Sequence, residues 1–310
     1  MKMNVVDVAT TGGDVRLLTL RHPRRPRLPE PTPGAHVDVR LPDGKVRQYS
    51  LCGDPDDATA YRIAVKLEPE GRGGSRWIHE HLVAGAVAHV SAPRNHFRLA
   101  ASAAQHVLVA GGIGITPLAA MAHRLVRDRS SFVLHYCARN AARAPLLAEL
   151  RALCGDRLQT YFPDGDGSRR FDAVVALAER PANAHVYCCG PARLVEHVRS
   201  AAAHWPGEAV HFEFFAPLAD DDFEPVPFEI FVASSGQTFT VPADRSALQI
   251  LRENGFSLSS SCELGVCGSC ECGYTAGHVI HRDVVLEADA RRNRMLLCVS
   301  RAEGRIVLDL

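Results

Sequence analysis

Four cysteines in the last fifth of the chain constrain its fold most strongly. Cys262, Cys267 and Cys270 follow the spacing C-x4-C-x2-C, and Cys298 comes after a long gap. This is the plant-type ferredoxin spacing, in which four thiolates bind a two-iron, two-sulfur (2Fe-2S) cluster. Such a cluster moves one electron at a time and transforms no organic substrate itself. The pattern therefore predicts electron transfer as the purpose of this part of the chain.

A structural zinc site is the alternative for these thiols. Zinc motifs usually pair two C-x2-C knuckles, whereas here the second knuckle is the single Cys298, so the spacing favours the cluster. Gly265 and Gly268 stand where the backbone must bend to aim N–H groups at sulfur. Cys272 follows the third ligand by two residues, and we expect an ordinary buried thiol. No cysteine is followed at the second position by histidine, which argues against a Rieske centre in this chain.

Length and charge narrow the class of protein. The 310 residues suit two or three domains. Lys and Arg number 35 against 35 Asp and Glu, with no long basic run, so nucleic acid is a poor candidate partner. The first residues lack an apolar signal core, and glycines and Pro117 interrupt the most apolar stretch, 107–122. We expect a soluble cytoplasmic protein with no membrane partner, in a reducing compartment.

Short β-type runs separated by turns fill residues 1–100. Their regular spacing predicts an antiparallel β-barrel or sandwich. The runs are Val15–Leu20, His36–Leu41, Tyr61–Leu67 and Val87–Val90.

The pattern changes near Ala101 to strands that alternate with helices, which predicts a doubly wound parallel sheet over 101–216. The strands are expected at 106–110, 132–136, 185–189 and 210–214, and the helices at 118–129, 146–154, 171–180 and 192–204. An acidic, proline-punctuated linker is expected at 217–227, followed by a ferredoxin domain at 228–310.

Two turns in the second region are candidates for a nucleotide site. The first, Gly111-Gly-Ile-Gly-Ile-Thr-Pro117, joins a strand to a helix, where glycines allow a pyrophosphate to approach the helix N-terminus. The second, Cys188-Cys-Gly-Pro191, also ends a strand, so both lie at the carboxyl ends where ligands bind. Alone, such a turn is often mere packing, and Cys189 is as well explained as an inert buried thiol. Arg139 follows a neighbouring strand, where it suits a phosphate or ribose but equally a solvated surface.

A flavin is implied because the donor and the acceptor differ in the number of electrons that they transfer at once. Nicotinamide gives two electrons as hydride, whereas the cluster takes one, so a group stable at the one-electron stage is needed. Arg47-Gln-Tyr49-Ser50 offers a cation, an aromatic face and a hydroxyl, and Gly71-Arg-Gly-Gly-Ser-Arg76 resembles an anion cradle before a helix. Taken singly, the first motif is equally well explained by an aromatic residue in an ordinary strand, and the second by an ordinary turn.

The ordered set of motifs resembles the phthalate dioxygenase reductase family over essentially the whole chain. The set comprises R-x-Y-S-L, G-R-G-G-S, G-G-I-G-I-T-P, C-G-P and the C-terminal cysteine pattern. The resemblance implies a flavin barrel, a nicotinamide domain of ferredoxin-NADP-reductase type and a β-grasp ferredoxin. Relatives with an N-terminal ferredoxin tend to hold FAD, so the C-terminal ferredoxin favours FMN.

The resemblance also implies roles for individual residues. Flavin contacts would be Arg47, Tyr49, Ser50 and Lys66, with Gly74, Ser75 and Arg76 at the phosphate. Nicotinamide-nucleotide contacts would be Gly112, Thr116, Arg139, Cys189, Gly190 and Pro191. Ser50, Thr116, Cys189 and Phe215 would be the catalytic set, Phe215 being the aromatic beside the flavin ring.

These expectations describe an NADH-dependent reductase that passes hydride to FMN and single electrons through the cluster to a separate oxygenase. The resemblance implies a Rieske-type aromatic oxygenase or O-demethylase as partner, and we expect a monomer. A haem monooxygenase is an alternative acceptor, and a non-enzymatic ferredoxin-like carrier is the alternative from another class. NADPH stays open because Arg139 and Arg143 both follow the second strand.

Overall fold

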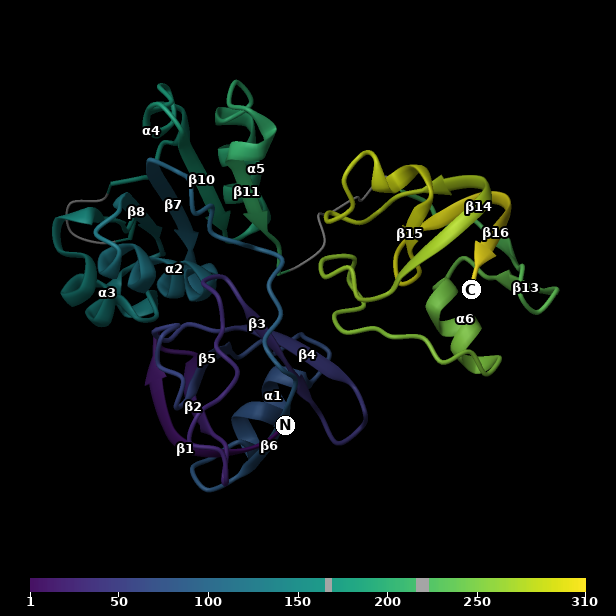
Figure 1. Ribbon diagram of the computed structural model, residues 1–310, viewed down its shortest axis with the longest axis horizontal. Helices are drawn as coiled ribbons and strands as arrows, with labels where there is room; N and C mark the ends of the chain where they lie inside the picture. The colour runs from purple at the N-terminus through teal and green to yellow at the C-terminus, as the bar shows by residue number, and fades with distance from the viewer. Residues whose placement is uncertain (165–168, 216–222) are drawn as a thin grey trace. The chain divides into compact units, whose positions relative to one another are not determined.

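The computed structural model describes residues 1–164, 169–215 and 223–310. The chain divides into two compact units, Met1–Glu213 and Phe214–Leu310. The first unit holds two sheets and the second holds one, as Figure 1 shows. Among the residues described, no helix is both long enough and apolar enough to cross a membrane.

The first sheet of Met1–Glu213 is an antiparallel barrel with the strand order β4-β3-β6-β1-β2-β5. A bridge between Leu51 and Ile63 joins the end of β4 to β5 and closes the sheet. Buried positions alternate along the strands, as expected when one face covers a core. The elements are β1 (Lys2–Thr11), β2 (Val15–Arg21), β3 (His36–Arg40), β4 (Val46–Ser50), β5 (Tyr61–Lys66), α1 (Gly74–His81) and β6 (Val87–Val90).

The second sheet is parallel throughout, with the order β11-β10-β7-β8-β9. The chain moves outward from β7 in one direction and then returns to the other side of it, so the topological switch point lies between β7 and β10. The strands are β7 (Gln105–Gly111), β8 (Ser131–Cys137), β9 (Leu158–Tyr161), β10 (Ala184–Cys189) and β11 (Val210–Glu213). The α-helices are α2 (Ile115–Arg127), α3 (Leu147–Cys154), α4 (Ala173–Ala176) and α5 (Ala192–Ala201).

Several elements differ from the sequence-based expectation. The helix expected at 171–180 is only the four-residue α4, whose Val174 and Val175 are exposed and supply no apolar face to extend it. Helix α2 begins three residues earlier than expected, because a short 3-10 turn leads directly into it and Pro117 is tolerated in a first turn. Strands β1, β4 and β9 lie outside the predicted runs, and the remaining strands of both sheets are confirmed.

The barrel and the parallel sheet share one hydrophobic core. Val15, Cys52 and Ala64 of the barrel region belong to the same buried cluster as Leu118 and Tyr136. At the edge of this core, Arg62 of β5 donates two hydrogen bonds to the carboxylate of Glu149 on α3, at 2.9 and 2.8 Å. The shared core and the contact between Arg62 and Glu149 together explain why the two sheets form a single compact unit.

The described residues of the second unit form a five-stranded mixed sheet with one α-helix. The order is β13-β12-β16-β14-β15, with β12 and β16 parallel and the other pairs antiparallel. Leu248 and Leu251 of the helix are buried in the core, and Ser246 and Gln249 form a capping box at its start. The elements are β12 (Phe228–Val232), β13 (Gln237–Val241), α6 (Ala247–Glu253), β14 (Glu271–Ile280), β15 (Arg294–Leu296) and β16 (Arg301–Asp309).

The expected linker at 217–227 falls partly outside the described residues, since 216–222 are not among them. Its described end belongs to the second unit and packs against it. Arg301 donates a 2.7 Å hydrogen bond to the carbonyl of Val226, and the Arg282 guanidinium lies 4.0 Å from the ring centroid of Phe223. Strand β12 begins at Phe228, the expected first residue of the C-terminal domain.

Candidate functional site

Two glycine-rich loops of the parallel sheet meet at the switch point. A Cβ atom on Gly114 would lie 2.2 Å from the carbonyl oxygen of Cys189, and one on Gly190 would lie 3.0 Å from the Cα of Gly111. These three glycines are needed for the two loops to touch. Gly112 differs, because its φ is +53° while the space beside it is open. The loops therefore meet backbone to backbone at the edge that a dinucleotide phosphate can approach.

The other predicted nucleotide residues differ in their burial and in their contacts. Thr116 is buried at the start of α2, and its hydroxyl donates a 3.1 Å hydrogen bond to the carbonyl of Ile113. Pro191 is the N-cap residue of α5. Arg139 is exposed just beyond β8. Arg143, the other basic residue there, forms an ion pair with Asp14 at 3.2 Å.

The end of strand β4 in the barrel contacts the carboxyl edge of the parallel sheet. Ser50 is buried, and its hydroxyl donates a 3.3 Å hydrogen bond to the carboxylate of Glu213 at the end of β11. Tyr49 precedes it on the strand, and burial raises the pKa of its phenol. Lys66 ends β5, where its ammonium contacts Glu68 at 2.6 Å. The structure thus joins the predicted flavin segment to the carboxyl edge of the parallel sheet.

A cradle for an anion lies between β4 and α1. Gly74 begins α1 so close to Arg47 that a Cβ there would lie 2.6 Å from Nε of the guanidinium. Gly73, with φ of +79°, occupies the N-cap position, and no side chain caps the helix. The Arg47 guanidinium donates hydrogen bonds to the carbonyls of Val46 at 2.8 Å and Arg72 at 3.3 Å beside the start of α1. A cation next to an uncapped helix N-terminus suits a phosphate.

The next two residues of α1 hold the adjoining loop. The hydroxyl of Ser75 accepts a 3.0 Å hydrogen bond from the amide of Glu68, and Arg76 donates one of 2.8 Å to the carbonyl of Pro69. Both side chains therefore support the cradle from the 68–76 segment.

Glu213 is a site residue that the motif analysis does not single out. Desolvation raises its carboxyl pKa to about 8, and the hydrogen bond from Ser50 opposes this only in part. Cys189 is its register partner on β10, and burial, followed by the nearby Glu213 carboxylate, raises the pKa of that thiol. The sequence signal that could have identified Glu213 is one acidic residue in the largely apolar run Val-His-Phe-Glu-Phe, at the carboxyl end of a parallel strand.

The four predicted cluster ligands are buried and arranged in two pairs. Cys262 is hydrogen-bonded to Cys267, and Cys270 to Cys298. Within the described ranges, no three His, Cys, Asp or Glu side chains gather around one metal position. A zinc ion needs four ligands around one centre, whereas a two-iron cluster divides four thiolates between two irons. The pairing fits the cluster better.

The backbone around these thiols also fits an anionic cluster. The amide of Leu264 donates a 3.3 Å hydrogen bond to the sulfur of Cys262. The hydrogen bond from Cys262 lowers the pKa of the Cys267 thiol to about 5, against the opposing effect of burial. Cys272 lies on β14, where its thiol faces the Gly273 carbonyl at 3.2 Å and burial raises its pKa to about 12.

Phe215, the predicted aromatic beside the flavin, is 40% exposed and belongs to the second compact unit, two residues past the end of β11. The structure thus brings together Ser50, Cys189 and Glu213 in the first unit, and the four thiols in the second.

Comparison with protein families agrees with this division. Residues 108–200 match the oxidoreductase NAD-binding domain, and residues 230–303 match the 2Fe-2S iron-sulfur cluster binding domain. With the barrel in front of them, these domains define an iron-sulfur oxidoreductase that draws on a pyridine nucleotide.

Full-length relatives name the family. The chain is 37% identical to phthalate dioxygenase reductase of Burkholderia cepacia over 313 residues, covering 100% of this chain and 97% of that protein. A solved structure titled phthalate dioxygenase reductase superposes with a TM-score of 0.77, at 37% identity, over 100% of this chain and 98% of that one. The chain belongs to the phthalate dioxygenase reductase family.

Two further likenesses bear on the acceptor. The chain is 44% identical to the tert-butanol monooxygenase / tert-amyl alcohol desaturase reductase subunit of Aquincola tertiaricarbonis, covering 91% of this chain and 88% of that protein. It also matches an intact type IV self-sufficient cytochrome P450 monooxygenase at 38% identity and a TM-score of 0.86. All of this chain is covered in that match, but only 41% of the longer cytochrome P450 chain.

Proposed function

We propose that this protein takes hydride from NADH onto FMN and passes single electrons through a 2Fe-2S cluster to a separate oxygenase. FMN supplies the change from a two-electron donor to a one-electron acceptor. The observation that carries the proposal is the contact between Ser50 and Glu213, 3.3 Å apart. It joins the barrel segment that suits a flavin ring to the sheet edge that suits a nicotinamide.

Individual residues have distinct tasks in this proposal. Tyr49, Ser50 and Lys66 contact the flavin ring, and Arg47, Gly74, Ser75 and Arg76 hold its phosphate. Gly112, Thr116, Arg139, Cys189, Gly190 and Pro191 bind the nicotinamide nucleotide. Ser50, Thr116, Cys189 and Phe215 border the reacting atoms, and Cys262, Cys267, Cys270 and Cys298 bind the cluster.

FMN rather than FAD is supported by the size of the anion cradle. One guanidinium, that of Arg47, lies beside the start of one eight-residue helix. That arrangement suits one phosphate group. Heating the protein and identifying the released flavin by chromatography tests this choice, and release of FAD would contradict it.

NADH rather than NADPH is supported by the ion pair of Arg143 with Asp14. A 2′-phosphate usually needs a basic side chain after the second strand, and this pair occupies one of the two available there. Comparing kcat/KM for the two nucleotides tests the preference. Equal or better efficiency with NADPH would refute it.

A Rieske-type aromatic oxygenase or O-demethylase is the proposed partner, since one full-length relative is named as a phthalate dioxygenase reductase. A haem monooxygenase is the second candidate, because the same architecture occurs within a chain titled as a cytochrome P450 monooxygenase. We also propose a monomeric, cytoplasmic protein with functional modules at 1–100, 101–216 and 228–310, joined by 217–227.

The decisive experiment is anaerobic titration of the purified protein with NADH. We expect flavin bands and the redder iron-sulfur absorbance in the oxidised protein, both bleached by NADH, with about one flavin and two irons per chain. A protein that shows only the iron-sulfur bands would instead be the non-enzymatic carrier. Coupled turnover with a purified Rieske oxygenase and with a purified haem monooxygenase then separates the two acceptors.

A further inference from the structure

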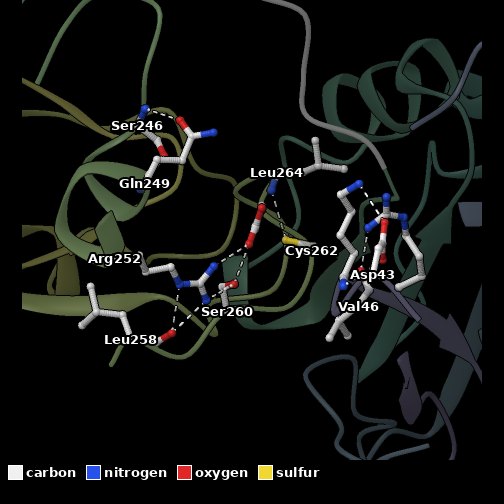
Figure 2. A network of polar contacts seen from close by, with 12 residues as sticks. Asp43, Val46, Ser246, Gln249, Arg252, Leu258, Ser260, Cys262 and Leu264 are labelled. Atoms are coloured by element: carbon white, nitrogen blue, oxygen red, sulfur yellow. Dashed lines mark hydrogen bonds and ion pairs between the residues drawn. The ribbon is translucent and has the colours of Figure 1, made fainter. Parts of the chain in front are cut away.

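One arginine of α6 contacts the segment that leads into the candidate cluster loop at several points. The guanidinium of Arg252 donates hydrogen bonds to the Leu258 carbonyl at 2.8 Å and to the Ser260 hydroxyl at 2.6 Å, as Figure 2 shows. It also forms an ion pair with Glu263 at 2.9 Å. The Ser260 hydroxyl in turn donates a 2.7 Å hydrogen bond to the same carboxylate oxygen. Three groups over six residues are therefore tied to one helix.

Glu263 needs such support because of its backbone conformation. It follows Cys262 directly, its side chain is exposed, and its φ is +54°. The left-handed region is unfavourable for a non-glycine residue, because its Cβ atom lies too close to the following carbonyl oxygen. Holding the carboxylate between Arg252 and Ser260 offsets that cost.

The left-handed turn at Glu263 decides where the next three amides point. The amide of Leu264 donates a 3.3 Å hydrogen bond to the sulfur of Cys262, and the amides of Val266 and Gly265 lie close to the sulfurs of Cys262 and Cys298. Gly265 is itself left-handed, with φ of +75°. Alternation of left- and right-handed residues turns successive N–H groups toward one side, which forms an anion-binding nest.

We propose that Arg252 is a positioning residue for the cluster. Through Glu263 it holds the nest of residues 264–266 against the ligand sulfurs and thereby sets the reduction potential and retention of the cluster. Amide hydrogen bonds to sulfur stabilise the more negative reduced cluster and so raise its potential. The inference rests on the proposed cluster ligands, and iron and sulfide content of the wild type tests that assumption separately.

The ion pair by itself does not account for this role. The side chains of Arg252 and Glu263 are 39% and 41% exposed, and surface pairs of this kind contribute little to stability. A loss of fold is therefore not expected when it is broken. The predicted consequence is local, at the sulfurs, and this is what the experiment must measure.

The test compares Arg252→Gln and Arg252→Lys with the wild type by redox titration of the cluster followed by electron paramagnetic resonance. Both variants should bind iron but show a more negative potential and lose iron to a chelator at least threefold faster. Lysine keeps the charge and loses the planar fork that reaches several acceptors. A purely Coulombic effect of the charge would leave Arg252→Lys unchanged, and that outcome would overturn the proposal.

A rescue variant separates positioning from any other effect of Arg252. Glycine adopts positive φ without strain, so Glu263→Gly in the Arg252→Gln background should restore most of the potential and of the iron retention. The double variant also has the same summed charge at the two positions as the wild type. No recovery in it would contradict the proposal, even if the single Arg252 variants lose their cluster.

The neighbouring pair Arg245–Glu253 provides the matched control. Glu253 is the residue after Arg252 on α6, and its carboxylate also pairs with an arginine, but its partner lies before the helix. Glu253→Gln should leave the cluster potential and its loss to chelator at wild-type values. An equal shift in this control would mean that any charge change on α6 has the same effect, and would overturn the role of Arg252.

Discussion

The candidate site in Met1–Glu213 is joined from segments far apart in the chain, whereas one loop of Phe214–Leu310 supplies three of four cluster ligands. Ser50 and Glu213 are 163 residues apart and meet only because the barrel packs on the parallel sheet. Cys262, Cys267 and Cys270 lie within nine residues. The comparison teaches that the first site depends on a large interface and the second on local backbone geometry, so they should fail independently.

The largest expected effect is on the second site. Cys298→Ser should reduce cytochrome c reduction to background, because the second thiolate pair loses a ligand. NADH oxidation with ferricyanide, which takes electrons from the flavin, should persist. Steady-state rates with both acceptors measure this.

Cys272→Ser is the matched control for that variant, since its thiol contacts only the Gly273 carbonyl in the hydrogen bonds seen. It should keep wild-type iron and sulfide. Iron loss in Cys272→Ser with retention in Cys298→Ser would reverse the ligand assignment. Loss of ferricyanide activity in Cys298→Ser would show that the two sites are not independent.

Removing the cation of the anion cradle should affect the first site alone. Arg47→Ala loses charge-assisted hydrogen bonds worth about 1.5–3 kcal/mol, which weakens flavin binding roughly 10- to 150-fold. Flavin fluorescence on dilution measures the release, while the cluster spectrum should persist. Lys45→Ala, which removes a neighbouring exposed ion pair with Asp43, should retain flavin. A cluster lost together with flavin would break the comparison.

The pH dependence of the ferricyanide rate should report on the first site, with the next largest effect. The pKa of Glu213 is raised to about 8, so its carboxyl is protonated below that pH and negative above it. A negative charge there opposes the arrival of hydride, so the ferricyanide rate should fall several-fold as pH rises through about 8. In Glu213→Gln that step should vanish. A step that survives in this variant would assign the titration to another group.

The smallest expected effect concerns the packing of the barrel on the parallel sheet. Arg62→Ala removes the bidentate contact with Glu149, in which the side chains are 27% and 32% exposed. The loss should be about 1–2 kcal/mol, which lowers the Tm of that unit by roughly 2–8 °C. Calorimetry measures it, with Arg199→Ala, from an exposed pair with Glu196, as the control. If Arg62→Ala also made the protein lose its cluster more readily, the two sites would not be independent.

Local patterns were sufficient for much of the architecture. The strands of the parallel sheet appear as apolar runs because both faces of such strands are covered, and β7, β8, β10 and β11 fall where those runs lie. Helix α4 was overestimated because its valines resemble an apolar face but are exposed. The roles given to individual residues in both sites remain predictions that the variants above can check.

By itself, the sequence determined the cysteine pattern, the glycine turns and the order of the modules, because these depend on residues close together in the chain. Only the tertiary structure decided that Ser50 meets Glu213, that Arg143 is paired with Asp14, and that Arg252 reaches the loop at Glu263. The physical reason is that an ion pair or a desolvated carboxylate depends on distance and burial. Those quantities exist only once separate segments have packed against each other.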